Sequence, residues 1–100
     1  MKERDAFRLY ETKLRIHARD KGRCQYPGCT APGFNLAHRI AQTKINIKLY
    51  GKDVIHHDDN LVLVCSCQEH NDYFNIGNRP AEREALVQQI REKIKEKMTV

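Results

Sequence analysis

Two pairs of side chains in this sequence have the spacing of metal ligands. Cys24 and Cys29 are separated by four residues on a segment rich in proline and glycine, and Cys65 and His70 are also separated by four residues. Structural zinc takes thiolate and imidazole ligands in a tetrahedral arrangement, with bonds of about 2.0 to 2.3 Å. We therefore predict one structural zinc ion per chain, bound by Cys24, Cys29, Cys65 and His70.

Two alternatives to this ligand set stay open. In the first, Cys65 and Cys67 are ordinary buried thiols and His70 is a surface residue; zinc is favoured because the same spacing recurs and a small domain needs extra stabilisation. In the second, Cys67 replaces His70 as the fourth ligand. Only one residue separates Cys65 from Cys67, and two sulfurs so spaced rarely converge on one tetrahedral ion. His70 is therefore the favoured ligand.

The length of the chain explains why a metal would matter. A chain of 100 residues forms one domain at most, and its apolar core only marginally holds a fold without help. Four cysteines can help as two disulfides or as a metal site, depending on the compartment. No apolar run follows the first five residues, so we expect no signal peptide, no membrane span and a place in the reducing cytoplasm. Cysteines mixed with histidines are typical of metal ligands there.

The charge balance favours an anionic partner without identifying one. Lysine and arginine number 18 against 13 acidic residues, which gives a formal net charge of +5 and a pI near 9.2. Such a bias is compatible with nucleic acid binding, but helices rich in lysine and glutamate are often simply solvated.

Hydrophobic periodicity and turn signals predict the elements that must position these residues. The first helix carries Phe7, Tyr10 and Leu14 at i, i+3 and i+7, and Gly22 is placed as its left-handed C-cap. Residues 41–59 are polar and give no clear pattern outside one helical turn. The expected elements, in order, are a helix over 2–21, a strand over 35–40, a helical turn over 45–50 ended by Gly51, a strand over 60–64, a helix capped by Ser66 in an S-x-x-E box and ended by Gly77, and a helix from Pro80.

Aromatic and aliphatic side chains of the last two helices are interpreted as packing residues. Tyr73 and Phe74 are expected in the core rather than in a platform that stacks on bases. The final helix has an apolar stripe with a spacing of four residues, which predicts packing or a homodimer contact; it consists of Leu86, Ile90, Ile94 and Met98.

Four motifs follow one another in an order that resembles the HNH endonuclease family. They are Cys24 with Cys29, then Ala37-His38-Arg39-Ile40, then Asn60-Leu61-Val62-Leu63-Val64-Cys65, then His70-Asn71. The resemblance spans residues 23–75 and implies an α+β fold, namely a small zinc-stabilised ββα-metal (HNH) module flanked by N- and C-terminal helices. It makes residues 1–100 a single nuclease domain, with a first helix over 1–22, the core over 23–77 and a last helix over 78–100.

The resemblance also implies a mechanism. By position, His38 would be the general base that activates water, Asn60 would orient it, and Asn71 would bind the catalytic Mg²⁺ or Mn²⁺, with zinc purely structural. The implied activity is metal-dependent hydrolysis of phosphodiester bonds in DNA, expected to be duplex and bound largely without sequence preference through basic side chains.

Two departures from the family pattern keep a rival hypothesis open. Many members have Asp or His just before the base histidine as a metal ligand, and here that residue is Ala37. The second ligand pair also has an unusual spacing. We expect His56 and His57 to be solvated loop residues, but their closeness to Asn60 in sequence makes them candidates to replace the missing ligand. The rival is a non-catalytic zinc module that binds nucleic acid or a protein partner.

Overall fold

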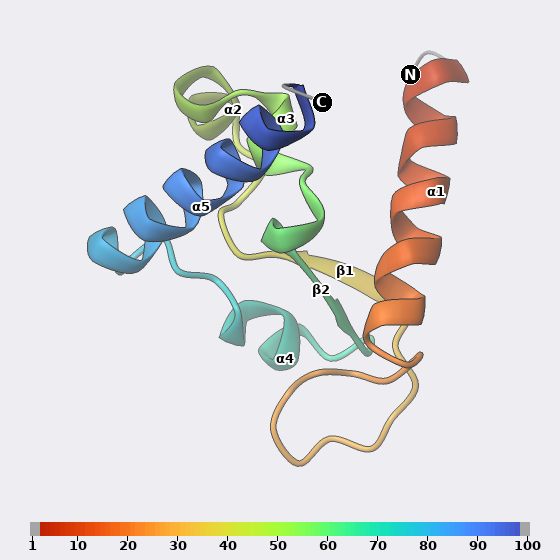
Figure 1. Cartoon of the computed structure of the whole chain (residues 1–100). Helices are drawn as coiled ribbons and strands as arrows, with labels where there is room; N and C mark the ends of the chain where they lie inside the picture. Colours follow the sequence, from red (N-terminus) through yellow and green to blue (C-terminus); the bar gives the residue numbers. More distant parts are fainter. Residues whose placement is uncertain (1–2, 99–100) are drawn as a thin grey trace.

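Two long helices lie at either end of the described chain, with a β-hairpin and four short helical segments between them (Figure 1). The computed structural model describes residues 3–98, with side chains from Tyr10 to Lys97. The expected first helical residue, Lys2, and the side chains of Phe7 and Met98 fall outside this part. In chain order the elements are α1 (Glu3–Arg19), β1 (Asn35–His38), α2 (Lys44–Tyr50), α3 (Lys52–Ile55), the 3-10 helix η1 (Asp58–Asn60), β2 (Leu61–Val64), α4 (Gln68–Tyr73) and α5 (Pro80–Met98).

The two strands pair antiparallel and bury both of their faces. The register places Leu36 opposite Leu63 and Ala37 opposite Val62. Because side chains alternate along a strand, the leucines pack on one face near Ile16 of α1, and Ala37 packs on the other face in a cluster that includes Phe74. Both strands are shorter than the predicted 35–40 and 60–64.

Helix α1 joins the hairpin through its last turn. Gly22 has φ 68° and its N–H donates to the carbonyl of His17, which confirms it as the left-handed end of the helix. The carboxylate of Asp20 accepts the N–H of Leu63 at 3.0 Å. The apolar stripe on which the helix was predicted is not a buried face in its described part: Tyr10 and Leu14 are 63% and 54% exposed.

The segment between the strands is more ordered than the sequence indicates. The helical turn predicted over 45–50 is confirmed as α2, where the Thr43 side chain accepts the N–H of Asn46 and Gly51 has φ 90°. Helices α3 and η1 were not predicted. Val54 and Ile55 of α3 are buried, so this segment contributes to the core instead of looping through solvent.

The main apolar cluster lies between this segment and α5. It includes Ile40 after β1 and Ile76 before α5, together with the buried residues Val54, Ile55, Leu86, Val87 and Ile90. The start of α5 at Pro80 is confirmed. The predicted stripe packs inside the chain through Leu86 and Ile90, with Ile94 partly buried against the cluster.

Helix α4 differs from the prediction at its N-terminal end. Its N-cap is Cys67, without a side-chain capping hydrogen bond, so the capping box predicted at Ser66 is wrong. The helix ends at Tyr73, before Gly77. Phe74 is half-buried against the hairpin as expected, but Tyr73 is 53% exposed and is therefore not a core residue.

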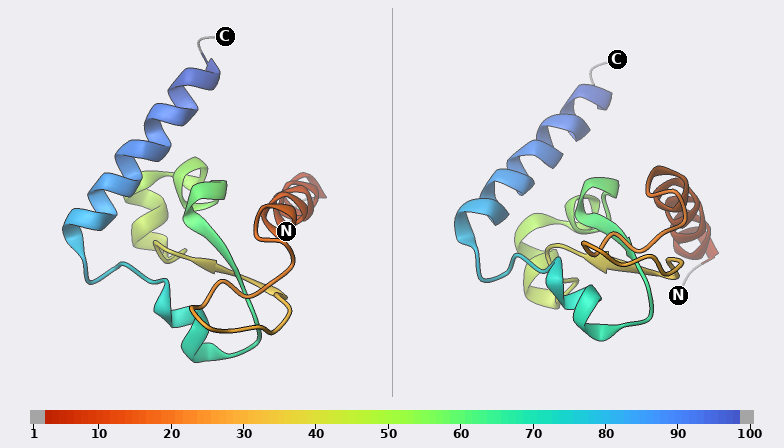
Figure 2. Two further views of the ribbon diagram at one scale, coloured as in Figure 1. Left: turned by 60° about the horizontal axis from the view of Figure 1, so that its bottom comes forward. Right: turned by 90° about the horizontal axis from the view of Figure 1, so that it is seen from below.

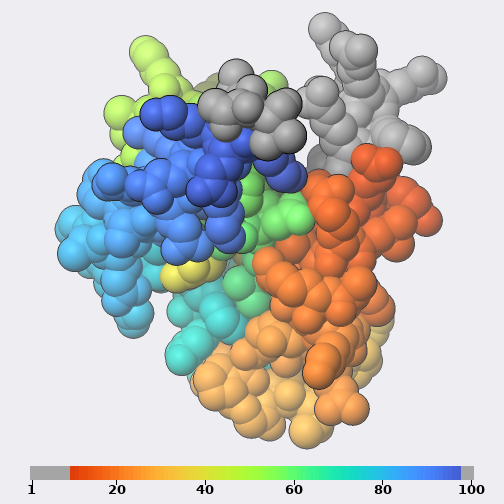
Figure 3. All heavy atoms as spheres, in the orientation of Figure 1, coloured from red at the N-terminus to blue at the C-terminus, as the bar shows by residue number. Residues whose placement is uncertain are grey.

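Further views show how the long helices are separated. Helix α5 extends away from the hairpin on the side opposite to α1 (Figure 2), and the loop 23–34 forms an end of the molecule next to α1 and α4 (Figure 3). None of the helices within residues 3–98 is long and apolar enough to span a membrane.

Candidate metal centre and histidine pair

The four predicted zinc ligands lie together. Their sulfur and nitrogen atoms are all within 4.8 Å of one another. His70 Nδ1 is 3.2 Å from the sulfur of Cys65 and 3.6 Å from that of Cys24. Zinc bonds of about 2.3 Å to sulfur and 2.0 to 2.1 Å to nitrogen place two tetrahedral ligands about 3.6 Å apart. The donor atoms therefore fit a zinc ion with little movement.

Local structure brings the first ligand pair to this point. The N–H of Cys29 donates to the carbonyl of Tyr26, closing a tight turn in which Gly28 has φ 83°. The Tyr26 ring then stacks on the imidazole of His70, with centroids 3.9 Å apart and planes 3° from parallel. This contact holds the orientation of the imidazole, so that Nδ1 faces the sulfurs of Cys24 and Cys65.

The environment of Cys24 suits a metal ligand. Burial raises the pKa of Cys24, but hydrogen bonds from the backbone of Tyr26 and Cys65 and from the His70 side chain outweigh it, so the pKa falls from 9.0 to about 7. The thiolate is the form that binds zinc. Cys67 is exposed and lies outside the cluster, so that His70 rather than Cys67 completes the group of four that could bind zinc.

A second feature is a pair of histidines from different segments. His38 ends β1, and its Nε2 is 3.5 Å from Nδ1 of His56, which follows α3. The two rings are nearly perpendicular, at 76°, and both residues are half-buried. His56 lies in the turn after α3, as expected, but it is only partly exposed to solvent. His57 is also engaged, because its Nδ1 accepts the N–H of Asp59.

The environment of His38 keeps its imidazole neutral. Burial and, secondarily, the positive charge of a protonated His56 lower the pKa of His38 from 6.5 to about 4. At neutral pH the ring therefore has a lone pair that can accept a proton or bind a metal ion.

The segment that carries His56 is tied to both long helices. Asp58 receives two hydrogen bonds from the Arg15 guanidinium of α1, at 2.9 and 3.0 Å. Asp59 binds Lys93 of α5 at 2.6 Å. These ion pairs are partly exposed and each contributes modestly to stability, but together they fix the segment between α1 and α5. The position of His56 beside His38 therefore depends on the tertiary structure.

Asn60 is the one buried polar residue among the residues described, and its amide is fully hydrogen-bonded. Its oxygen accepts the N–H of Ile40 at 2.8 Å. Its nitrogen donates to the carbonyls of Ile40 at 3.1 Å and Ile55 at 2.8 Å. Asn60 therefore joins the chain just after His38 to the end of α3, just before His56. The structure gives it a positioning role that exceeds that of a turn residue.

Asn71 and Ala37 are placed differently from the histidine pair. Asn71 is half-buried on α4, and its side chain has no hydrogen bond within the part of the chain that the structure describes. Ala37 is 1% exposed and offers only a methyl group to its cluster. Strand alternation directs Ala37 and His38 to opposite faces of the hairpin. Asn71 and His38 share no hydrogen bond or ring contact among the described residues.

No family model, curated protein or solved structure matches this chain.

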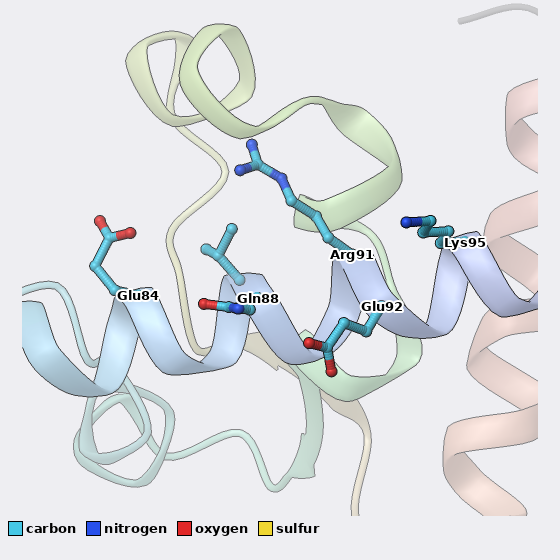
Figure 4. Close-up of a pocket in the computed structure, with 6 residues that line it drawn as sticks. Glu84, Gln88, Arg91, Glu92 and Lys95 are labelled. Atoms are coloured by element: carbon cyan, nitrogen blue, oxygen red, sulfur yellow. The ribbon is translucent and has the colours of Figure 1, made fainter.

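Hollows are also present on the surface of the described chain. One, of about 350 Å³, is lined only by side chains of α5, with both signs of charge: Glu84, Val87, Gln88, Arg91, Glu92 and Lys95 (Figure 4). This arrangement is that of a solvated helix face. The other, of about 500 Å³, lies beside Ile40 and Ala41 and is lined by polar residues from three further segments, among them Arg83. No sequence motif pointed to Arg83, because its neighbours there are remote along the chain.

Proposed function

We propose that the chain is a metal-dependent endonuclease of the HNH kind that hydrolyses phosphodiester bonds in DNA. The observation that carries the proposal is the position of His38. It ends a strand whose hairpin partner leads directly into the Cys65–His70 half of the metal centre, and its imidazole is half-buried and neutral at pH 7. The order of these motifs, which resembles the ββα-metal arrangement, supports the same function.

His38 would act as the general base. Hydrolysis of a phosphodiester requires removal of a proton from water while the attacking oxygen is held in line with the leaving group. The neutral ring of His38 can accept that proton. Asn60 fixes the backbone at Ile40, and His56 contacts the His38 ring, so both would restrict the motion of the base.

A divalent cation would stabilise the charge that develops on the phosphate and the leaving oxygen. The chain offers an incomplete set of ligands for it. Asn71 has an amide oxygen suited to Mg²⁺ or Mn²⁺, but Ala37 provides no donor where the family has Asp or His. His56 offers an imidazole beside His38 and is the residue we expect to compensate. The zinc ion at the cysteines would have a structural role only.

The decisive experiment is a plasmid-nicking assay with zinc-loaded protein and added Mg²⁺ or Mn²⁺. The wild type should nick supercoiled DNA, and His38→Ala should lower the rate by roughly 10²- to 10⁴-fold, because a positioned base contributes about that much. His17→Ala is a matched control, since His17 is an exposed histidine on α1 and should retain full activity.

Zinc content, circular dichroism and DNA affinity are measured on the same samples. We expect them to be unchanged in His38→Ala. If this variant unfolds or loses zinc, His38 is structural and the mechanism fails. If it stays folded and cuts at the wild-type rate, another group is the base.

Ala37 favours a second candidate function, a non-catalytic zinc module that binds nucleic acid. Its buried methyl group occupies the position of a catalytic ligand. This function predicts the same zinc content and salt-dependent DNA binding, but no nicking by the wild type with any divalent ion.

A further inference from the structure

The hollow beside Ile40 and Ala41 brings together four segments of the chain, and we call it the Arg83 pocket. Ile40 and Ala41 follow β1, Asn46 lies on α2, and Arg83 lies on α5. The remaining wall is formed by α4 and the turn after it, through Asp72, Asn75, Gly77 and Asn78. Its volume of about 500 Å³ is within the range of small-ligand sites.

Arg83 lines this pocket and has a donor without a partner. One terminal nitrogen of its guanidinium donates to the carbonyl of Gly77 at 2.8 Å, which holds the side chain over the turn. Its Nε is buried, yet it has no hydrogen-bond partner among the residues that the structure describes. No ion pair neutralises its charge within that same part of the chain. Buried donors are nearly always satisfied, and a charged donor makes its strongest bonds to anionic oxygens.

The other polar groups of the pocket are mostly amides, together with one carboxylate. The Asn46 nitrogen is engaged with the carbonyl of Ala41 at 2.9 Å, so its oxygen remains as an acceptor. Asn78 is exposed and has no side-chain hydrogen bond within the described residues. Asp72 accepts from Gln68 and adds a negative charge on the α4 side. Such a lining disfavours a ligand that is anionic throughout, and it suits one with a single anionic group and a polar, amino-bearing ring.

We infer that the Arg83 pocket binds one nucleotide unit of a nucleic acid strand, with its phosphate on Arg83 and its base among the asparagine amides. Asparagine can pair with an adenine edge, and aspartate can accept from the amino group of cytosine. The choice of a nucleotide over another ligand with one anionic group rests on the proposed function.

One wall of the pocket, at Ile40, lies close to His38 along the chain. Ile40 is two residues beyond His38, so their Cα atoms are at most about 7 Å apart. Nucleotides of one duplex strand follow each other at about 3.4 Å along the axis. The bound unit would therefore lie within a few nucleotides of the bond that faces His38.

The test follows the Nε–H signal of Arg83 by ¹⁵N-correlated NMR, with zinc-loaded protein and no catalytic metal. The probes are dAMP, dCMP, inorganic phosphate and a short single-stranded oligonucleotide. We expect the nucleotides and the oligonucleotide to shift this signal, with phosphate alone at least tenfold weaker. Arg83→Gln should weaken nucleotide binding about tenfold or more, because a hydrogen bond to a charged group is lost.

Arg91→Gln is the matched control, since it removes the same charge from α5 outside the pocket and should change the affinity less than twofold. Asn78→Ala is a second pocket variant whose exposed side chain makes folding defects unexpected; it should weaken nucleotides but not phosphate. Equal binding of phosphate and nucleotides, or equal loss in both arginine variants, would overturn the inference. Because nothing is cleaved in this experiment, nucleotide binding by a protein that fails to nick DNA would reject the proposed function alone.

Discussion

Replacing Asn60 with alanine tests the positioning role that the structure assigns to it. The side chain is fully buried and joins Ile40 to Ile55 through three hydrogen bonds of 2.8, 3.1 and 2.8 Å. Asn60→Ala would leave one N–H and two carbonyl groups without these partners in a site closed to water. Each buried group left unsatisfied costs about 1 to 2 kcal/mol, which gives a loss of about 3 to 6 kcal/mol.

This loss is large compared with the total stability of a small domain, about 5 to 15 kcal/mol. Urea denaturation of zinc-loaded protein, followed by circular dichroism, measures it directly. Asn78→Ala is the control, since it removes the same amide from an exposed position and should change stability by less than about 0.5 kcal/mol. A loss below about 1 kcal/mol in Asn60→Ala, with an unchanged denaturant slope, would refute the assignment.

Three further predictions concern the metal, the hairpin and pH. Cys24→Ser combined with Cys29→Ser should abolish zinc retention after dialysis and unfold the domain, because the metal supplies stability that the small core lacks; intact folding would contradict a structural zinc. Gly33→Ala should lower the free energy of unfolding by about 1 to 3 kcal/mol in denaturant experiments, because a Cβ there would collide with the buried Leu63 side chain. An unchanged free energy of unfolding would show that the hairpin shifts to accommodate the added methyl group. The lowered pKa of His38 means that the unfolded chain binds more protons than the folded chain between pH 6.5 and about 4. His38 therefore lowers the free energy of unfolding as the pH falls through this window. The difference in unfolding free energy between the wild type and His38→Gln should change within the window and be constant above pH 7.

The sequence alone predicted the features that depend on local spacing. Cys24, Cys29, Cys65 and His70 were identified because tight turns and short helices place ligands at fixed intervals, and their donor atoms lie close together, as a tetrahedral metal site requires. The start of α5 was predicted from Pro80, and α2 from its apolar residues and Gly51, since both signals act within a few residues.

Predictions failed where distant segments compete for the same residue. The Tyr10 and Leu14 stripe of α1 is exposed because the helix meets the hairpin only through its last turn, where Ile16 is buried. The capping box at Ser66 did not form, and the helix begins after Cys67 instead, beside the strand that carries Cys65. Segments such as α3, with four residues, are too short to show a hydrophobic periodicity of their own, so tertiary packing determines their conformation.

Spacing along the sequence therefore determined the candidate metal centre and the order of the elements, whereas the neighbours of the candidate catalytic residues were decided by the tertiary structure. His38 and His56 are 18 residues apart, and Ile40 and Asn60 are 20 apart. They meet because Asp58 and Asp59 bind opposite terminal helices and the amide of Asn60 links both segments. Contacts between such remote residues depend on the packing of the whole chain, and no local pattern encodes them.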